Sequence, residues 1–336
     1  MTIIGLGPHG ERASPPERVT LLPQDITAAR AKGLRVAIVM HTLDSDWSRH
    51  LVQGVVGMMG ECGAIVIDVV DCNFSPEAQI AALRRLCDEK PDAIISLPID
   101  NTTVAQDHIA VSAAGIKLVL IDNVPTGMLP GKDYAALVSV DNYGLGKIAA
   151  ELLSDHLPAN ASTGLLGYDA DFFAVNEREI AFSQSMERNR PDVTVRTARF
   201  SSIDDAGEQT RRMLADHPDI AGLFVVWDTP CIDVIRMVSE LNLTLPITTV
   251  DLGQEVTENL AKGGSVVGIA GQRPFQQGEA IAKTTITALL GRPCPDWVAL
   301  PGLAVTRSNV IECYQSVWRK HAPREILVGL DALRQG

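Results

Sequence analysis

The sequence predicts an α/β protein with two doubly wound parallel-sheet lobes joined by a hinge of three chain crossings. From residue 34 to residue 122, short and almost continuously apolar runs alternate with segments of helical periodicity. This alternation is typical of parallel strands covered by helices on both faces. It begins again after Asp141. A final β-α segment over 297–320 is too small for a separate domain, so it must complete a sheet that is already built.

The first half of the chain is predicted to begin with a short helix and to continue as alternating strands and helices. The helix covers 23–33, and residues 1–22, which are rich in Gly and Pro, are expected to be poorly ordered. Strands are predicted at 34–40, 64–70, 92–97 and 117–122, with helices at 46–61, 76–89 and 103–115 between them. A further apolar run at 136–140 predicts a strand that leads out of this sheet, because a new helix follows it.

The second half repeats this order. Strands are predicted at 163–168, 193–200, 222–227, 247–251 and 265–271, and helices at 145–157, 174–189, 203–217, 230–241, shortly after 251, and at 274–291. The crossings between lobes are placed at Val138 to Asp141, Gly271 to Arg273 and Leu300 to Thr306. The predicted division is an N-terminal extension over 1–33, a first lobe over 34–139 plus 273–303, and a second lobe over 140–272 plus 304–336.

Composition narrows the classes of function. The net charge of −12 argues against a polyanionic partner, because nucleic-acid binding depends on Lys and Arg, so no nucleic acid is expected. No apolar run approaches the roughly 18 residues of a membrane-spanning helix. The first residues lack the basic start and long apolar core of a secretory signal, which leaves a cytoplasmic protein, a removed signal or a sequence with a misassigned start. The six cysteines are scattered and are expected to be small buried hydrophobes, with a disulfide left open.

The candidate ligand-binding residues follow the predicted strands, because open α/β sheets bind ligands beyond the carboxyl ends of their strands. In chain order they are His41, Asp46, Trp47, Asp122, Asn123, Asp171, Phe172, Phe173, Asn176, Trp227, Asp228, Asp251, Gln272 and Arg273. Aromatic residues make up only 4% of the chain, and an unusual share of them stands at these positions.

Carboxylates, amides, one Arg and flat aromatic rings suit a small neutral polyhydroxylated molecule. A carboxylate accepts from two adjacent hydroxyls, and an aromatic ring covers the C–H face of a sugar. For Asp46, Asp171 and Asp228 the competing interpretation is a helix cap. Phe172 and Phe173 could instead pack between the lobes, and His41 could serve a local hydrogen bond.

Catalytic motifs are absent from the sequence. It contains no GxSxG, HExxH, phosphate-binding loop or GxGxxG after a strand, and no cysteine or histidine cluster with metal-ligand spacing. We therefore expect no enzyme, no cofactor and no metal. A sugar-processing enzyme remains an alternative, because facing carboxylates also serve hydrolases.

The chain resembles the periplasmic sugar-binding proteins of the ribose-binding type, the type I periplasmic binding protein fold that serves ABC importers. The resemblance covers about 34–320 and lies in VMHTLDSDWSRHLVQG, LVLIDNVP, VSVDNYGLGKIAAE, VVWDTP, TTVDLG and GQRPFQQG, in that order. It implies that Trp47 is a stacking aromatic, Asp122 and Asp251 bind hydroxyls, Trp227 is a second-lobe contact, and Gln272 is the hinge amide.

Three departures from the ribose-binding pattern stand out. Asn123 occupies a position that is often Arg, Asn176 aligns with the usual second-lobe Arg, and Leu97 replaces an amide. These departures favour another pentose, a deoxy sugar or a linear polyol over ribose.

The resemblance further implies a periplasmic monomer that closes around its ligand and docks on the membrane subunits of an ABC permease. A cytoplasmic sensor related to the effector domain of LacI-type repressors is the alternative. Those repressors carry a helix-turn-helix ahead of the core, where this chain has a short segment containing Pro and Gly.

Overall fold

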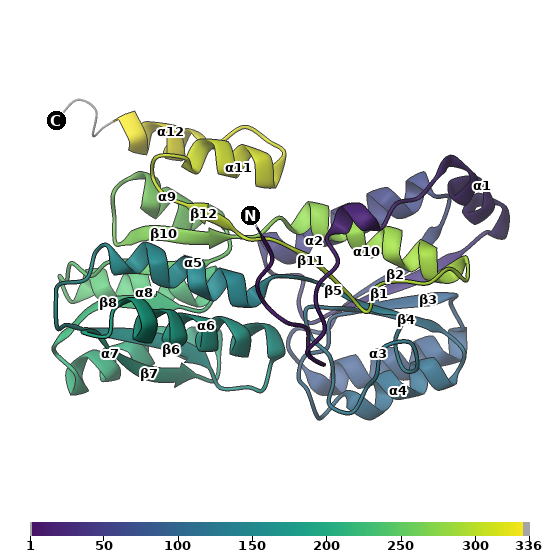
Figure 1. The fold of residues 1–336 in the computed structure, drawn as a ribbon, viewed down its shortest axis with the longest axis horizontal. Helices are drawn as coiled ribbons and strands as arrows, with labels where there is room; N and C mark the ends of the chain where they lie inside the picture. The colour runs from purple at the N-terminus through teal and green to yellow at the C-terminus, as the bar shows by residue number, and fades with distance from the viewer. Residues whose placement is uncertain (1, 332–336) are drawn as a thin grey trace.

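In the computed structural model, which describes residues 2–331, the chain forms two six-stranded sheets that lie side by side (Figure 1). The first sheet has the order β11-β5-β4-β3-β1-β2, and each neighbouring pair is parallel. Its strands are β1 (Arg35–Met40), β2 (Ile65–Asp71), β3 (Ala93–Ser96), β4 (Lys117–Ile121), β5 (Ala136–Val140) and β11 (Trp297–Leu300).

The second sheet has the order β12-β10-β9-β8-β6-β7. Its strands are β6 (Ser162–Tyr168), β7 (Thr194–Phe200), β8 (Ile220–Val225), β9 (Ile247–Val250), β10 (Val266–Gly271) and β12 (Leu303–Val305). The pair β10 and β12 is antiparallel, although the sequence predicted parallel sheets. The chain enters β12 directly from the carboxyl end of β11 through Pro301 and Gly302, so β12 must run opposite to strands that end at the same cleft.

Helices cover both faces of each sheet. Those of the first lobe are α2 (Asp46–Glu61), α3 (Pro76–Glu89), α4 (Ala105–Ala113) and α10 (Pro274–Leu289). Those of the second lobe are α5 (Asn142–Ser154), α6 (Phe173–Asn189), α7 (Ala206–Asp216), α8 (Asp228–Glu240), α9 (Gln254–Ala261), α11 (Val310–Trp318) and α12 (Arg324–Asp331).

The first-lobe core lies on both sides of its sheet because buried strands alternate their side chains between two faces. In β1, Val36 and Ile38 join the apolar cluster beneath α2 and α10, while Ala37 and Val39 join the cluster on the other face. The helices α2 and α10 approach closely where Gly54 meets Phe275 and Gly278 meets Leu51, positions at which an added Cβ would strike backbone.

The chain crosses between the sheets after β5, after β10 and after β11, as the sequence predicted. The first and third crossings are joined by a hydrogen bond in which Asp141 N donates to Leu300 O at 2.8 Å. The strands fall into the two sheets as the predicted division into lobes requires. The exact lobe boundaries stay a prediction. Residues 332–336, assigned to the second lobe, lie outside the described residues.

The expectation that residues 1–22 are poorly ordered was wrong for residues 2–22. Ser14 N donates to Trp297 O at 2.8 Å, and Ala299 N donates to Ser14 O at 3.1 Å, so Ser14 extends the exposed edge of β11. A short 3₁₀ helix, η1 (Pro16–Arg18), and α1 (Pro23–Lys32) follow. Local composition suggested disorder because it cannot reveal pairing with a strand almost 300 residues away.

Several helix boundaries also moved. Helix α5 begins at Asn142 rather than 145 because the Asp141 side chain accepts from Gly144 N at 2.9 Å and caps the helix. The 203–217 segment divides into a 3₁₀ turn, η2 (Ile203–Asp205), and α7. Helix α12 was not predicted from the sequence, although Ile326 within it is fully buried.

Candidate functional site

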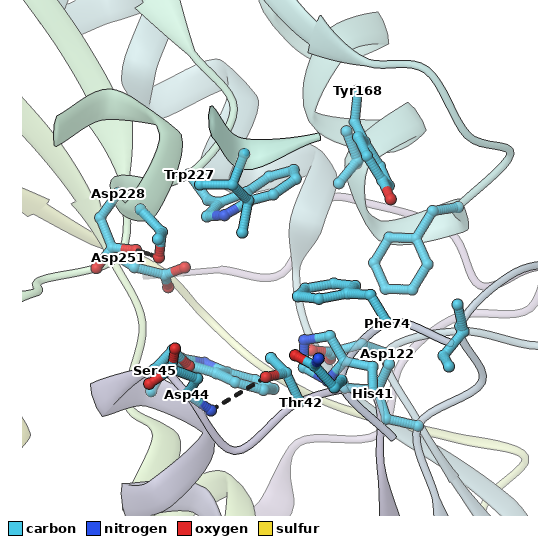
Figure 2. A pocket seen from close by; sticks show the side chains of 18 of the residues that line it. His41, Thr42, Asp44, Ser45, Phe74, Asp122, Tyr168, Trp227, Asp228 and Asp251 are labelled. Carbon is cyan, nitrogen blue, oxygen red and sulfur yellow. Dashed lines mark hydrogen bonds between the residues drawn. The ribbon is translucent and has the colours of Figure 1, made fainter. Parts of the chain in front are cut away.

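A cavity of about 370 Å³ lies between the two lobes, where the carboxyl ends of both sheets face each other. Residues from strand ends of both lobes line it, and Figure 2 shows Asp228 and Asp251 on one side with His41 and Asp122 on another. The sequence-predicted residues that line it are His41, Trp47, Asp122, Phe172, Trp227, Asp228, Asp251 and Gln272. The structure therefore brings these residues together, and their contact with a ligand stays a prediction.

Two predicted residues outside the lining belong to the boundary between the lobes. The amide of Asn123 is fully buried and engaged at both ends, because Nδ2 donates to Pro98 O at 3.1 Å and Oδ1 accepts from Phe173 N at 3.1 Å. Phe173 contributes its backbone to this bond, while the neighbouring Phe172 lines the cavity. Phe172 also packs against apolar clusters of both lobes.

Other predicted residues outside the lining make contacts within one lobe or across the hinge. Asp46 pairs with Arg49 at 2.9 Å, while Ser45 caps α2 in its place. Asn176 Nδ2 donates to Asp171 Oδ1 at 2.8 Å. The remaining residue is Arg273, which donates through Nη2 to Pro301 O at 3.0 Å and so joins the second crossing to the third.

The most important residue that the sequence did not single out is Arg178 in α6. Its side chain is buried, with Nε donating to Asn142 Oδ1 at 2.9 Å and Nη1 donating to Val226 O at 3.0 Å. Among the described residues that line the cavity, Arg178 is the only Arg or Lys. Arg178 stands two residues after Asn176, the position that the sequence aligned with the usual second-lobe Arg, so the cavity has a guanidinium that this alignment did not anticipate.

Further lining residues also escaped the sequence prediction: Thr42, Asp44, Ser45, Asn73, Phe74, Leu97, Ile99, Tyr168, Val175, Ile203, Asp204 and Thr229. Several stand within a few residues of a predicted strand end, and that position was the available signal for them. Leu97 stood out in the sequence only as a departure from a family pattern.

Carboxylates dominate the electrostatics of the cavity. Burial raises the pKa of Asp122 to about 7, against the opposing charge of Arg178 and a hydrogen bond from Gln277 Nε2 at 2.9 Å. Burial also raises the pKa values of Asp228 and Asp251, and repulsion from Asp251 raises that of Asp228 further. A hydroxyl-rich ligand would supply donors to these groups.

The backbone conformation at two strand ends orients the side chains of two of the carboxylates. Asp122 has a φ of 53° and Asp251 a φ of 73°, so both occupy the left-handed region at the end of a strand. Such conformations cost on the order of 1 kcal/mol and concentrate at functional sites. Oδ1 of Asp251 is buried with no hydrogen-bond partner among the described residues, so this oxygen keeps an unfilled capacity to accept a bond.

Aromatic side chains form much of the remaining wall. Trp47 Nε1 donates to Gln272 Oε1 at 3.1 Å, which fixes the indole of the first lobe against the second crossing. Trp227 and Tyr168 meet edge to face with centroids 5.3 Å apart. Burial lowers the pKa of His41 to about 4, so its ring is neutral near pH 7.

The six cysteines, all in the described part of the chain, are unpaired, and three of them, Cys62, Cys72 and Cys231, are buried. Within residues 2–331, no group of three or more His, Cys, Asp or Glu side chains is arranged to hold a metal ion. Among the helices of residues 2–331, none combines the length and the apolar character that a membrane-spanning helix needs.

Two α/β lobes, three crossings and a cleft lined from both lobes define a two-lobe binding protein. Residues 36–293 match the family model described as a periplasmic binding protein domain, and the chain belongs to this family. The ribose import binding protein of Bacillus subtilis is 21% identical over 270 residues, which is 80% of this chain and 86% of that protein. The Haemophilus influenzae ribose import binding protein is 23% identical over 239 residues, 71% of this chain and 80% of that one.

Solved structures show the same fold. An ABC transporter solute-binding protein from Agrobacterium vitis, bound with α-D-tagatopyranose, superposes with a TM-score of 0.79 at 22% identity, covering 85% of this chain and 100% of that one. One from Mycobacterium smegmatis with bound glycerol gives a TM-score of 0.77 at 21% identity, covering 87% and 100%.

Proposed function

We propose that this protein binds a small carbohydrate or polyol between its lobes and delivers it to an ABC permease. The observation that carries the proposal is the cavity itself, in which Asp122 of the first lobe and Asp251 of the second lie with Trp47 and Trp227 around about 370 Å³. Carboxylates that accept from hydroxyls and rings that cover C–H faces are the groups that such ligands need.

The two-lobe arrangement suits a closing mechanism. A ligand that touches both lobes binds the closed form more tightly than the open form and so shifts the population toward closure. A shift from mostly open to mostly closed needs about 5 kcal/mol of differential binding. A few hydrogen bonds to charged groups, at about 1.5–3 kcal/mol each, supply energy of that order.

The ligand class we propose is a neutral pentose, deoxy sugar or linear polyol. Support comes from the relatives, whose names record import of ribose, a pentose, and from a similar structure with bound glycerol, a linear polyol. Both ends of the Asn123 amide are hydrogen-bonded within the protein. A ligand near Asn123 therefore meets fewer cationic donors than it would meet in a site with Arg at that position.

The remaining parts of the proposal follow from the family. The family is described as a periplasmic binding protein domain, and a similar structure is that of an ABC transporter solute-binding protein, which supports a periplasmic location and docking on permease subunits. We extend the proposal to a monomer. The relatives are solute-binding proteins rather than enzymes, so we propose that the ligand leaves chemically unchanged.

A thermal-shift screen of sugars and polyols tests the proposal. A ligand at about 100 times its Kd stabilises the folded protein by roughly 2.7 kcal/mol, which raises the melting temperature by several degrees. The panel contains D-ribose, D-arabinose, D-tagatose, D-fucose and glycerol. If no sugar or polyol raises the melting temperature, the proposed ligand class is wrong.

Substitution of the carboxylates locates the site. Asp122→Ala and Asp251→Ala are each expected to weaken binding of the selected sugar at least about tenfold, because each removes an acceptor that faces the cavity. Asp46→Ala is the matched control, since Asp46 lies on the surface of α2 and pairs with Arg49. Normal binding by both cavity variants would place the ligand elsewhere.

A further inference from the structure

The walls of the cavity differ in polarity along the order of the strands. On the strands near the hinge, β4 leads to Asp122, β9 to Asp251 and β10 to Gln272. Farther from the hinge in the first lobe, β3 leads to Leu97 and Ile99, which also line the cavity. Beyond β3, β1 leads to the lining residues His41 and Thr42, so Leu97 and Ile99 stand between polar lining groups of the neighbouring strands β4 and β1.

The apolar wall is held in place by buried polar side chains that face away from the cavity. Gln79 is fully buried, and its Nε2 donates to Leu97 O at 2.9 Å while its Oε1 accepts from Ile99 N at 3.0 Å. Asn123 Nδ2 donates to Pro98 O at 3.1 Å. These bonds occupy backbone polar groups of the 97–99 loop, so what the loop offers to the cavity is chiefly the side chains of Leu97 and Ile99.

Phe74 adds an apolar ring to the cavity from the end of β2, the outermost strand of the first lobe, and this ring meets that of His41 edge to face with centroids 5.0 Å apart. Ser75 N donates to Cys72 O at 2.8 Å, and the two central residues of this turn, Asn73 and Phe74, have φ values of 46° and 55°. Turns with two positive φ values favour Asn followed by Gly, whereas a bulky residue at the second position is strained. A ring that lines the cavity gives a reason for Phe to occupy that position.

We propose that the ligand carries a deoxy carbon, a methyl or methylene in place of a hydroxyl-bearing carbon, and that Leu97, Ile99 and Phe74 receive it. This inference rests on the proposed function and specifies its substrate class. A hydroxyl held against these three side chains would lose water without gaining a partner from them, whereas a C–H group would lose nothing polar. The hydroxyls at the other end of the ligand meet Asp122, Asp251 and Gln272.

Matched sugar pairs test the inference by calorimetry on the full chain. The pairs are D-fucose with D-galactose, L-rhamnose with L-mannose, and 2-deoxy-D-ribose with D-ribose, each differing by one hydroxyl. We expect the deoxy member of at least one pair to bind about tenfold to a hundredfold more tightly than its partner, the range in which apolar pockets discriminate. Equal or tighter binding of the hydroxylated member in every pair that binds would overturn the inference while leaving the proposed function intact.

Leu97→Asn tests the wall itself, because it places a donor and an acceptor where the chain has an isobutyl group of similar size. The deoxy preference is expected to shrink to less than about threefold, since the added hydroxyl then finds a partner. Leu129→Asn is the control, because Leu129 is 48% exposed and lies outside the cavity. An unchanged preference in Leu97→Asn would overturn the assignment of this wall.

The melting temperature of Phe74→Gly tests the role of the Phe74 ring without any ligand. Glycine relieves the positive φ while the ring is lost, so we expect the melting temperature of the ligand-free variant to stay within about 3 °C of the parent. Phe182→Ala, which removes a fully buried core ring, is expected to lower it by about 6–15 °C. A fall of that size in Phe74→Gly would show that the ring serves packing and overturn its ligand role.

If no sugar or polyol binds at all, the proposed function fails and the deoxy assignment fails with it.

Discussion

At the scale of single residues, the cavity is defined by carboxylates that the fold keeps away from bulk water. Asp122, Asp228 and Asp251 all have pKa values raised mainly by burial. Each therefore binds its proton more tightly in the folded protein than in the unfolded chain, where Asp titrates near 3.9. Stability that these groups contribute is present at low pH and is lost as pH rises through their folded pKa values.

The first prediction concerns the pH dependence of ligand-free stability. Between about pH 6.5 and pH 8.5 the melting temperature is expected to fall, as the last protons leave Asp122 and Asp228. This window avoids His41 and His108, whose pKa values are both lowered by burial to about 4 and which oppose the effect below about pH 6.5. Differential scanning calorimetry at several pH values measures the slope.

Asp228→Asn is the matched variant for this prediction. Its side-chain oxygen can still accept from Gly253 N, which lies 3.0 Å from Asp228 Oδ2, but it cannot ionise. We expect a flatter pH profile and a higher melting temperature at about pH 8.5 than in the parent, because one crowded negative charge is gone. A profile as steep as that of the parent would contradict a role for Asp228 in it.

The sequence could identify candidate ligand-binding residues only where they follow the end of a predicted strand. Asp122 and Asp251 were found because they directly follow buried strands, and both line the cavity. Arg178 was missed because it projects from within a helix, and helical position alone does not show which face meets a cleft. Asn123 directly follows Asp122, yet its amide turns to Pro98 and Phe173, a choice made by tertiary contacts.

At the scale of elements, the N-terminal segment fastens the first lobe to the start of α5. Residue Asp141 accepts from Ile4 N at 2.7 Å, from Gly5 N at 3.1 Å and from Gly144 N at 2.9 Å, so one carboxylate caps the helix and holds the segment. Ten residues later, Ser14 pairs with β11 of the first sheet. In Figure 1 the segment runs from the N-terminal label past β11 and β5, beside the crossings.

The second prediction tests this carboxylate. Asp141→Ala is expected to lower the free energy of unfolding by about 2–4 kcal/mol, because it removes a helix cap and a charged acceptor of two further N–H groups. Amide hydrogen exchange over residues 3–14 is expected to become faster at the same time. Urea denaturation and exchange mass spectrometry measure the two effects.

Asp155→Ala is the control at the opposite end of the same helix. Asp155 is exposed at the α5 C-terminus, where a negative charge is unfavourable, so its removal is expected to change stability by less than about 0.5 kcal/mol. Slow exchange over 3–14 in Asp141→Ala would mean that the segment is held by its β11 pairing alone.

Periodicity located the main elements, while their partners came from contacts that local sequence does not encode. The order of the first-sheet strands follows from alternation and short connections. The antiparallel β12 depends on the direction in which the chain enters the second lobe, and the pairing of Ser14 with β11 depends on an edge that only the folded sheet presents. Neither leaves a periodic signal in the sequence.

At the scale of the whole molecule, the bond between Asn123 and Phe173 is one of the contacts that join the lobes without a ligand. Helix α6 begins after Phe172, and no side chain of its own segment caps it. The first N–H groups of a helix lack partners within it. Phe173 N instead donates to Asn123 Oδ1 of the other lobe, and the fixed orientation of that amide comes from Pro98 O. Asn123 therefore acts as a helix cap that exists only while the lobes are together.

The third prediction follows from this interlobe cap. Asn123→Ala leaves Phe173 N without its acceptor in the closed form, whereas opening gives that N–H access to water. The closed form is therefore expected to lose about 1–3 kcal/mol relative to the open form, which weakens ligand affinity by roughly 5-fold to 150-fold. Small-angle scattering should give a larger radius of gyration for the ligand-free variant than for the parent, with the two converging at saturating ligand.

Asn176→Ala is the control, because Asn176 bonds to Asp171 within the second lobe and opening does not expose that bond. If Asn123→Ala scatters like its parent and binds as tightly, the Asn123–Phe173 bond does not contribute to closure.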